Sequence, residues 1–299
     1  LLRAFRWPGW RRSMTLSRWR RSSPSTATCA RPCTSPTRTA LPSAALLVLL
    51  LPLAEATAIG FTVPISFSLD LGNKTLIGDE VLIIDAGMGF PEESAYGVDV
   101  CVPDFDFLDE YRDEITAIVL THGHEDHLGA LPYLLKKFNV PVYCSHFTAG
   151  LAESKLEEHD LLGDVLLHRV EPRDVVEIGV FSVEFIRVSH SLVDCFSLGI
   201  KTPVGTIIHT GDYKVDETPV IGEPIDLRSF RRYGQDGVLA LLSDSTNATV
   251  PGRTPSERAV IPAFEEIFSE AKGRIIVAAF ASSIHRLQIV LDVAQQATR

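Results

Sequence analysis

Cysteine is scarce in this sequence, and no two cysteines form a short C-x-x-C pair. The 299 residues include five cysteines and no C-x-x-C motif: Cys29, Cys33, Cys101, Cys144 and Cys195. An odd number of scattered cysteines argues against both a disulfide framework and a thiolate zinc site. A reducing compartment fits this pattern best, and we therefore expect a cytoplasmic protein.

Long hydrophobic runs are missing as well. The apolar run at residues 44–51 covers eight positions, whereas a helix that spans a bilayer needs about 20. No membrane protein is therefore predicted. Hydrophobic residues make up 45% of the chain and charged residues 22%, which excludes disorder throughout and indicates a globular protein.

Residues 1–54 contain no acidic residue and no lysine, but they hold nine arginines. Of the 28 basic residues in the chain, 19 remain for the rest, which has 38 acidic residues and a formal charge of −19. A field of this sign repels phosphate. A nucleic acid would therefore need a local basic groove and metal ions in order to bind.

Residues 1–57 are predicted to form an atypical leader, rich in Arg, Ser, Thr and Pro. An organellar transit peptide has this composition, and a secretory signal combines a basic segment with an apolar core. A non-native or mistranslated stretch is the third interpretation, favoured by a first residue that is Leu rather than Met. A transit peptide would place the protein in an organelle instead of the cytoplasm.

From residue 61 onward, short β-branched apolar runs alternate with helical patterns, which predicts an α/β sandwich. Strands are predicted at residues 81–84, 115–120, 181–188, 206–209 and 239–242, and helices at 128–138 and 149–158. Polar residues follow each of these strands. We therefore expect the functional side chains at strand ends.

The last part of the chain is predicted to continue the α/β pattern. Thr254, Pro255 and Glu257 are typical of a capping box at a helix start, and Gly273 would end that helix. A strand is expected at residues 274–280 and another helix from Ser283 onward. Because the pattern runs to the last residue without a terminator, we expect a fragment of a longer protein.

The densest cluster of potential metal ligands is the run Thr121-His122-Gly123-His124-Glu125-Asp126-His127. Three imidazoles and a carboxylate this close together are hard to bury, whereas divalent metal ions bind such groups. Gly123 allows a turn that aims His122 and His124 at one point, and Asp126 with His127 at a neighbouring one. A solvated polar turn is the alternative, which the dense ligand spacing disfavours.

Three residues that follow other strands complete the predicted site. His190 and Asp212 would supply a third imidazole for one ion and a carboxylate that bridges both. Asp85 is predicted to orient a ligand imidazole through its free N–H. Taken alone, each is weak evidence, because a single His or a Gly-Asp pair is more often a polar or turn residue. Three histidines lack such a context and are expected in surface or structural positions: His146, His159 and His168.

Around these residues the sequence resembles the ribonuclease J family, in the β-CASP branch of the metallo-β-lactamase superfamily. The likeness covers about residues 78–299. The matching stretches are IDAGM at 84–88 with 90–91, residues 121–132, 190–191 with 194, 209–214, LSDSTN at 242–247 and FASSIHR at 280–286. They are more specific than the histidine motif of the whole superfamily.

This resemblance implies a metallo-β-lactamase αββα sandwich over residues 58–243, incomplete in this chain, followed by the beginning of a β-CASP α/β domain over residues 244–299. It also implies six metal ligands: His122, His124 and His190 for one ion, Asp126 and His127 for the other, and Asp212 as a bridge. Asp244 would help to position the nucleophilic water or the scissile phosphate. The expected catalytic residues are Asp85, Asp126, Asp212 and Asp244.

The sequence departs from that family at several positions. Residues 61–74 match the glycine-rich opening strand and turn of the family poorly, and Ser283 and Cys195 stand where Asn and Ser are usual. The later β-CASP histidines and the 5′-phosphate pocket would fall beyond Arg299. The proton donor for the leaving 3′ oxygen is therefore expected to be absent, and we expect this chain alone to be weak or inactive.

The resulting prediction is a metal-dependent ribonuclease that hydrolyses single-stranded RNA from the 5′ end and internally, with two divalent ions activating water. Zinc is the favoured metal, although N and O ligands also suit manganese. The full-length parent is expected to be a homo-oligomer. The alternatives are a small-molecule hydrolase of the same fold and a catalytically inactive fragment that binds metal or RNA. No clear cationic track with stacking aromatic residues is visible for RNA.

Overall fold

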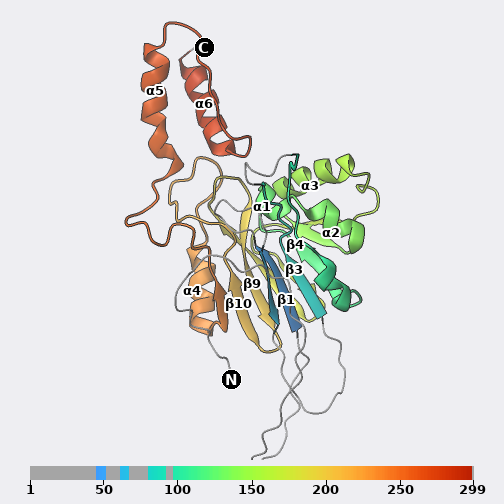
Figure 1. Ribbon diagram of the computed structural model, residues 1–299. Helices are drawn as coiled ribbons and strands as arrows, with labels where there is room; N and C mark the ends of the chain where they lie inside the picture. The colour runs from blue at the N-terminus through green and yellow to red at the C-terminus, as the bar shows by residue number, and fades with distance from the viewer. Residues whose placement is uncertain (1–44, 52–60, 67–79, 92–96, 298–299) are drawn as a thin grey trace, which may run out of the picture. The chain divides into compact units, whose positions relative to one another are not determined.

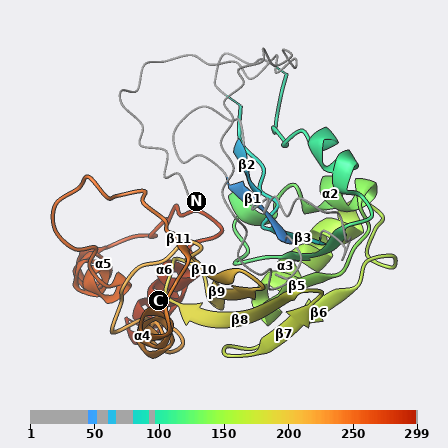
Figure 2. The same ribbon diagram turned by 90° about the horizontal axis from the view of Figure 1, so that it is seen from below.

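The computed structural model describes residues 45–51, 61–66, 80–91 and 97–297. These residues form a six-stranded sheet in the order β2-β1-β3-β4-β5-β6 and a five-stranded sheet in the order β11-β10-β9-β8-β7. Helices α1 to α3 lie on the side of the first sheet, and α4 lies beside the second (Figure 1). Figure 2 shows the two sheets from below, with β8 and β7 curving past the first sheet.

The first sheet is parallel from β1 to β6, and β2 pairs antiparallel with β1 at its edge. Its strands are β1 (Ala45–Leu51), β2 (Phe61–Ser66), β3 (Glu80–Ile84), β4 (Ile115–Val119), β5 (Val142–Cys144) and β6 (Leu167–Arg169). Nearly continuous apolar runs in β3 and β4 are typical of parallel strands that are covered on both faces.

The second sheet is antiparallel except for the parallel pair of β10 and β11. Its strands are β7 (Val175–Ile178), β8 (Phe181–Val188), β9 (Cys195–Thr202), β10 (Gly205–His209) and β11 (Ala240–Leu242). Within β9, Gly199 leaves room for the ring of Tyr233, because a Cβ there would lie 2.5 Å from that ring.

Successive side chains of β3 enter two different cores. Val81 and Ile83 pack against the helical layer, whereas Leu82 and Ile84 face the second sheet. The helical layer consists of α1 (Glu125–Leu128), α2 (Leu131–Lys137) and α3 (His146–Glu158), with the 3-10 helix η1 (Asp106–Tyr111) beside them. The helix predicted at residues 128–138 is thus divided into α1 and α2.

The same alternation along β8 builds the fourth layer. Phe181 and Phe185 point between the sheets, and Ile186 packs on the outer side under Tyr233 of α4 (Leu227–Asp236). The order of layers is helix, sheet, sheet, helix, which confirms the predicted αββα sandwich. The strands predicted at 81–84, 115–120, 181–188, 206–209 and 239–242 all correspond to observed strands, within one residue at either end.

The apolar run that was expected in the leader forms β1 and pairs in parallel with β3. A short stretch of consecutive Leu and Val suits a parallel strand as well as it suits a signal core. The predicted leader of residues 1–57 therefore contains a strand of the first sheet. Residues 1–44 of that leader lie outside the described residues.

The final segment consists of η2 (Glu257–Val260), α5 (Ile261–Glu270) and α6 (Ile284–Gln296). Helices α5 and α6 lie side by side, with Phe268, Ile289 and Val293 buried between them (Figure 1). The helix predicted from Ser283 onward is confirmed as α6.

Two predictions for this segment were wrong. The cap is Ser256, whose Oγ accepts the N–H of Arg258, because a turn of 3-10 helix precedes α5 and moves the start away from Thr254. Residues 274–280 form no strand among the described residues. A strand needs a neighbouring edge to bond, and here Ile276 is 93% and Phe280 83% exposed.

No helix within the described ranges is both long enough and apolar enough to cross a membrane.

Glu184 provides a test of how α4 is attached to the second sheet. The residue is 6% exposed, accepts a hydrogen bond of 2.6 Å from Tyr233 Oη and forms an ion pair with Arg232. Burial alone would raise the pKa of Glu184, but the hydrogen bonds from Arg232 and Tyr233 lower it below its usual range.

Glu184→Gln is expected to lower the free energy of unfolding at pH 7 by about 1–2 kcal/mol, because a charged hydrogen-bond acceptor is lost. A depressed pKa stabilises the fold above the unfolded-state value and loses this effect as the pH falls through the folded-state value. The difference from wild type in urea unfolding should therefore shrink from pH 7 toward acid. Glu177→Gln on exposed β7 is the control, with a change of less than about 0.5 kcal/mol expected. An undiminished difference in acid would contradict this assignment.

Candidate metal centre

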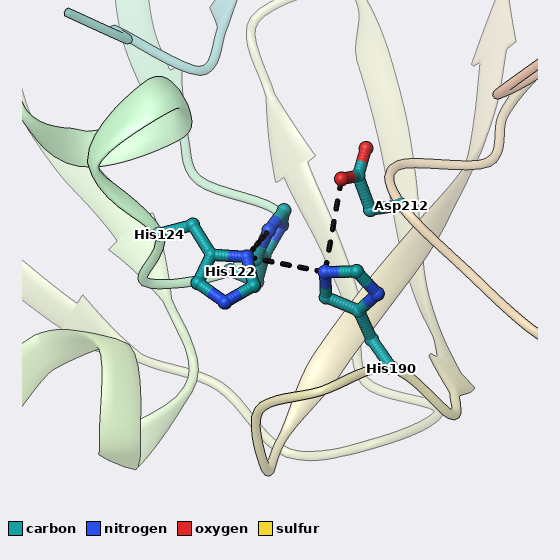
Figure 3. Close-up of side chains that lie close together, drawn as sticks. All are labelled: His122, His124, His190 and Asp212. Atoms are coloured by element: carbon teal, nitrogen blue, oxygen red, sulfur yellow. Dashed lines mark hydrogen bonds and ion pairs between the residues drawn. The ribbon is translucent and has the colours of Figure 1, made fainter. Parts of the chain in front are cut away.

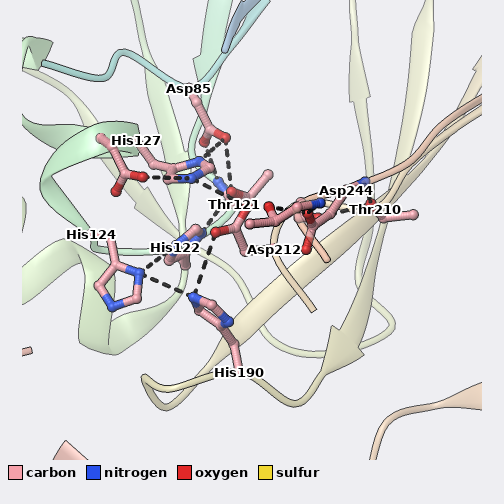
Figure 4. Close-up of polar contacts among 12 residues, drawn as sticks. Asp85, Thr121, His122, His124, His127, His190, Thr210, Asp212 and Asp244 are labelled. Carbon is pink, nitrogen blue, oxygen red and sulfur yellow. Dashed lines mark hydrogen bonds and ion pairs between the residues drawn. The ribbon is translucent and has the colours of Figure 1, made fainter. Parts of the chain in front are cut away.

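The predicted site residues come from the segments that directly follow five strands. Asp85 follows β3, the run from Thr121 to His127 follows β4, His190 follows β8, Asp212 follows β10 and Asp244 follows β11. Figure 4 shows these side chains gathered at one edge of the sandwich. Because each strand ends where its apolar run ends, the local sequence pattern determines which side chains reach this edge.

The first group consists of His122, His124, His190 and Asp212, whose ligand atoms all lie within 4.8 Å of one another (Figure 3). Nδ1 of His124 lies 2.9 Å from Nε2 of His122 and 3.1 Å from Nε2 of His190. One ring nitrogen cannot satisfy two others at once, since it offers either one proton or one lone pair. Three converging imidazole nitrogens with a carboxylate match the donor set of a divalent cation.

The second group consists of Asp126, His127 and Asp212. Nε2 of His127 lies 3.8 Å from Oδ2 of Asp126 and 3.5 Å from Oδ1 of Asp212. The other oxygen of Asp212, Oδ2, lies 3.7 Å from Nε2 of His190 in the first group. The two oxygens of one carboxylate thus face the two groups, an arrangement that suits a bridging ligand.

Asp85 and Thr121 fix the orientation of two of these imidazoles. The Asp85 carboxylate is fully buried and lies 2.7 Å from Nδ1 of His127. Thr121 donates its hydroxyl to Asp85 at 2.8 Å, so that the same oxygen can accept the Nδ1–H of His122 at 3.0 Å. With Nδ1 as the donor in these contacts, the neutral form of each ring carries its lone pair on Nε2, which is directed at the ligand groups.

The histidine nitrogens of the first group are suited to bind a cation near neutral pH. Burial lowers the pKa of His122 well below its usual range, and the neighbouring histidines lower it further. Burial also lowers the pKa of His190, to about 4, against the attraction of Asp212. Neutral imidazole is the form that binds metal ions.

In the second group, the neighbouring charges raise the pKa of the histidine instead of lowering it. Burial alone would lower the pKa of His127, but the carboxylates of Asp85 and Asp212 raise it well above its usual range. Burial alone would raise the pKa of Asp212, which His127 and His190 instead lower. Asp212 is therefore ionised, and the excess negative charge around His127 favours a cation.

Asp244 lies near Asp212 in Figure 4 but belongs to neither ligand group of the described residues. Its Oδ1 accepts hydrogen bonds from the backbone and hydroxyl of Thr246, and its N–H donates to Thr210 Oγ1 at 2.8 Å. The three histidines without sequence context lie outside both groups: His146 pairs with Glu171, His159 contacts Lys136, and His168 stacks on Tyr143.

Sequence reasoning missed Thr121, Ser191 and His209 as parts of the site. Ser191 Oγ lies 3.1 Å from Nε2 of His124, which leaves Nδ1 of that ring for the ligand group. His209 is buried below the site and accepts the N–H of Gly211 at Nδ1, and burial lowers its pKa to about 4. All three are immediate or near neighbours of predicted ligands, and that adjacency was the available signal.

Residues 69–249 match the metallo-beta-lactamase superfamily, which is more than half of the chain. The chain belongs to this superfamily. It is 47% identical over 235 residues to ribonuclease J of Synechocystis, a match that covers 77% of this chain and 37% of that protein. Ribonuclease J of Helicobacter pylori is 47% identical over 69% of this chain and 30% of its own length, and that of Thermus thermophilus is 44% identical over 73% and 39%.

The resemblance to ribonuclease J expected from the sequence is thereby confirmed. The chain spans 30% to 39% of the length of these three relatives.

A substitution at Gly87 tests how closely the segment with the predicted metal ligands, residues 121–127, packs against the end of β3. A Cβ at Gly87 would lie 1.7 Å from the carbonyl oxygen of Asp126, between the hydrogen bonds from Ala86 to His127 and from Met88 to Glu125. Gly87→Ala is expected to lower the free energy of unfolding by about 2 kcal/mol or more through overpacking, and to reduce bound zinc because Asp126 is displaced.

Gly150→Ala is the matched control, since Gly150 in α3 has open space around it. That variant should be as stable as wild type or about 1 kcal/mol more stable, as expected for Ala in a helix. Thermal unfolding and metal analysis check both variants. Wild-type stability and zinc content in Gly87→Ala would refute the close contact.

Thr121→Val removes the hydroxyl between Asp85 and His122 with little change of volume. We expect zinc affinity to fall about tenfold or more, as for other groups that orient a ligand imidazole. Competition with a chromogenic chelator measures the effect. Thr116→Val on β4, which loses a hydrogen bond of 3.0 Å to Val81 away from the site, should change the affinity less than about twofold. Equal losses in both variants would argue against the orienting role of Thr121.

Proposed function

We propose that this chain carries the binuclear metal centre of a ribonuclease that hydrolyses phosphodiesters in RNA. The main support is Asp212, whose two carboxylate oxygens face two separate ligand groups. The similarity to ribonuclease J of three organisms supports RNA as the substrate. In the intact protein we expect cleavage from the 5′ end and internally.

The proposed ligands are His122, His124 and His190 for one ion, Asp126 and His127 for the other, and Asp212 for both. Divalent ions in these positions would supply a hydroxide nucleophile near neutral pH and neutralise the charge of the phosphate. Asp85 holds His127 in the correct tautomer and His122 through Thr121. We assign Asp244, beside Asp212, to orienting the attacking water or the phosphate.

We further propose that residues 58–243 belong to the metallo-β-lactamase domain and that residues 244–299 begin a β-CASP domain. Residues 245–297, which include η2, α5 and α6, contribute no strand to either sheet. The position of β1 suggests that the first domain starts before residue 58. Zinc is the preferred metal in this proposal, with manganese as the alternative. A cytoplasmic location and a homo-oligomeric parent stay predictions, as does an organellar location if residues 1–57 act as a transit peptide.

Two other functions lead to different results. A small-molecule hydrolase of the same fold would share the ligand groups but would cleave a thioester or a lactone. A catalytically inactive metal- or RNA-binding fragment would bind metal ions or RNA without turnover of any of these substrates.

The direct test measures bound metal and turnover of 5′-monophosphorylated single-stranded RNA, beside DNA of the same sequence, a thioester and a lactone. We expect two ions per chain and cleavage of RNA alone. Cleavage of the thioester or the lactone, and not of RNA, would contradict the proposal.

Asp126→Ala should lose one bound ion and the RNA cleavage, because it removes a carboxylate ligand from the second group. Glu125→Ala is the matched control. It removes the neighbouring carboxylate, which forms an ion pair of 2.8 Å with Lys155 and belongs to neither ligand group. Two bound ions and unchanged cleavage in Asp126→Ala would refute the proposed centre.

A further inference from the structure

A small cavity lies beside His190, which is one of its lining residues. Its volume is about 70 Å³, and it is lined by the loop that follows β8, by residues 219–223, and by Asp216, Glu257 and His285. This volume suits a few water molecules, each of which takes about 30 Å³ in the liquid. These lining residues connect the edge of the sandwich that carries the two ligand groups to helix α6.

Two side chains in this lining keep a buried polar atom without a hydrogen-bond partner among the described residues. They are Ser189, through its Oγ, and His285, through its Nδ1. Ser189 is 8% and His285 5% exposed. An unsatisfied buried polar atom destabilises a fold by about 1–3 kcal/mol. A leucine at position 285 would avoid that penalty, so packing alone does not account for this histidine.

His285 is attached to the loop that carries His190. Its Nε2 lies 3.3 Å from the carbonyl oxygen of Leu192, two residues after His190. A carbonyl only accepts hydrogen bonds, so Nε2 is the protonated nitrogen and Nδ1 is a buried acceptor. Ile284, the neighbour of His285, packs with Val188 at the start of the same loop and with Leu192 within it.

A second connection reaches the loop that carries Asp212. The N–H of Lys214, two residues after Asp212, donates to the carbonyl of Ser189 at 2.7 Å. The Lys214 ammonium pairs with Glu257 at 2.9 Å, and Glu257 also pairs with Arg286 at 3.2 Å. The segment that contains Glu257, His285 and Arg286 therefore contacts the loops of both His190 and Asp212.

We propose that His285 is a positioning residue for the metal ligand His190, acting through Leu192 and through the small cavity that His285 and Ser189 both line. Helix α6 thereby holds the third imidazole of the first ligand group in place. The inference rests on the metal centre of the proposed function. It adds that the position of His190 in that centre depends on the segment after residue 244.

The experiment measures zinc affinity of the whole chain by chelator competition, together with the number of zinc ions bound. His285→Leu is expected to weaken the binding of one of the two ions about tenfold, the lower end of the effect of groups that orient a ligand. His285→Gln, which can still donate to Leu192, should stay within about threefold of wild type. Val293→Ala is the structural control, because it loosens the packing of α6 on α5 without touching the loop.

A double-mutant cycle with His190→Ala separates positioning from general destabilisation. If His285 acts through His190, His285→Leu has no further effect on zinc affinity once His190 is replaced. The proposal is overturned if His285→Leu binds zinc like wild type, if its effect persists in the His190→Ala background, or if Val293→Ala weakens binding equally.

Should His285→Leu fail to fold, His285→Gln and His285→Asn make the same comparison. Gln reaches the Leu192 carbonyl and should retain zinc affinity, whereas the shorter Asn should lose it. Equal affinities overturn the proposal.

A wild-type chain that binds no zinc or manganese refutes the proposed function together with this inference. A wild-type chain that binds two ions, with no loss in His285→Leu, refutes the inference alone.

Discussion

The arrangement of the two ligand groups depends on the buried carboxylate of Asp85. It accepts the backbone N–H of Thr121 at 2.7 Å, the Thr121 hydroxyl at 2.8 Å and the imidazole of His127 at 2.7 Å. A carboxylate that is fully buried must be paired or hydrogen-bonded, or it would destabilise the fold by several kcal/mol. Asp85 itself has a φ of 60°, a conformation that Asp tolerates better than most residues. The ends of β3 and β4 and the start of α1 are thereby held by one side chain.

Much of this edge could be predicted because the relevant information is local. A polar residue that directly follows an apolar strand must emerge at the strand's end, and Asp85, His190 and Asp212 each have this position. The alternation of side chains along β8 likewise follows from the period of a strand. The turn at Gly123 already separates His122 and His124 from Asp126 and His127, and the resemblance to ribonuclease J added the role of Asp244.

The remaining features depend on contacts between distant segments. His285 meets Leu192 across 93 residues of sequence, and no local pattern marks either partner. Residues 274–280 have the composition of a strand, but strand formation needs an available edge. The run at residues 44–51 suits both a leader and a strand, and only its pairing with β3 distinguishes the two. Strand β9 is not predicted for the same reason. Its Gly199 leaves room for the ring of Tyr233, which belongs to a different segment of the chain.

The parallel pairing of β10 with β11 has a further consequence for the architecture. In an otherwise antiparallel sheet, the crossover through α4 brings the chain back so that β11 ends at the same edge as β10. The polypeptide therefore leaves the sandwich at the rim of the metal centre rather than at its opposite end. Any structure attached at this exit grows out next to the two ligand groups. Changes there can alter access to these groups while both sheets stay as they are.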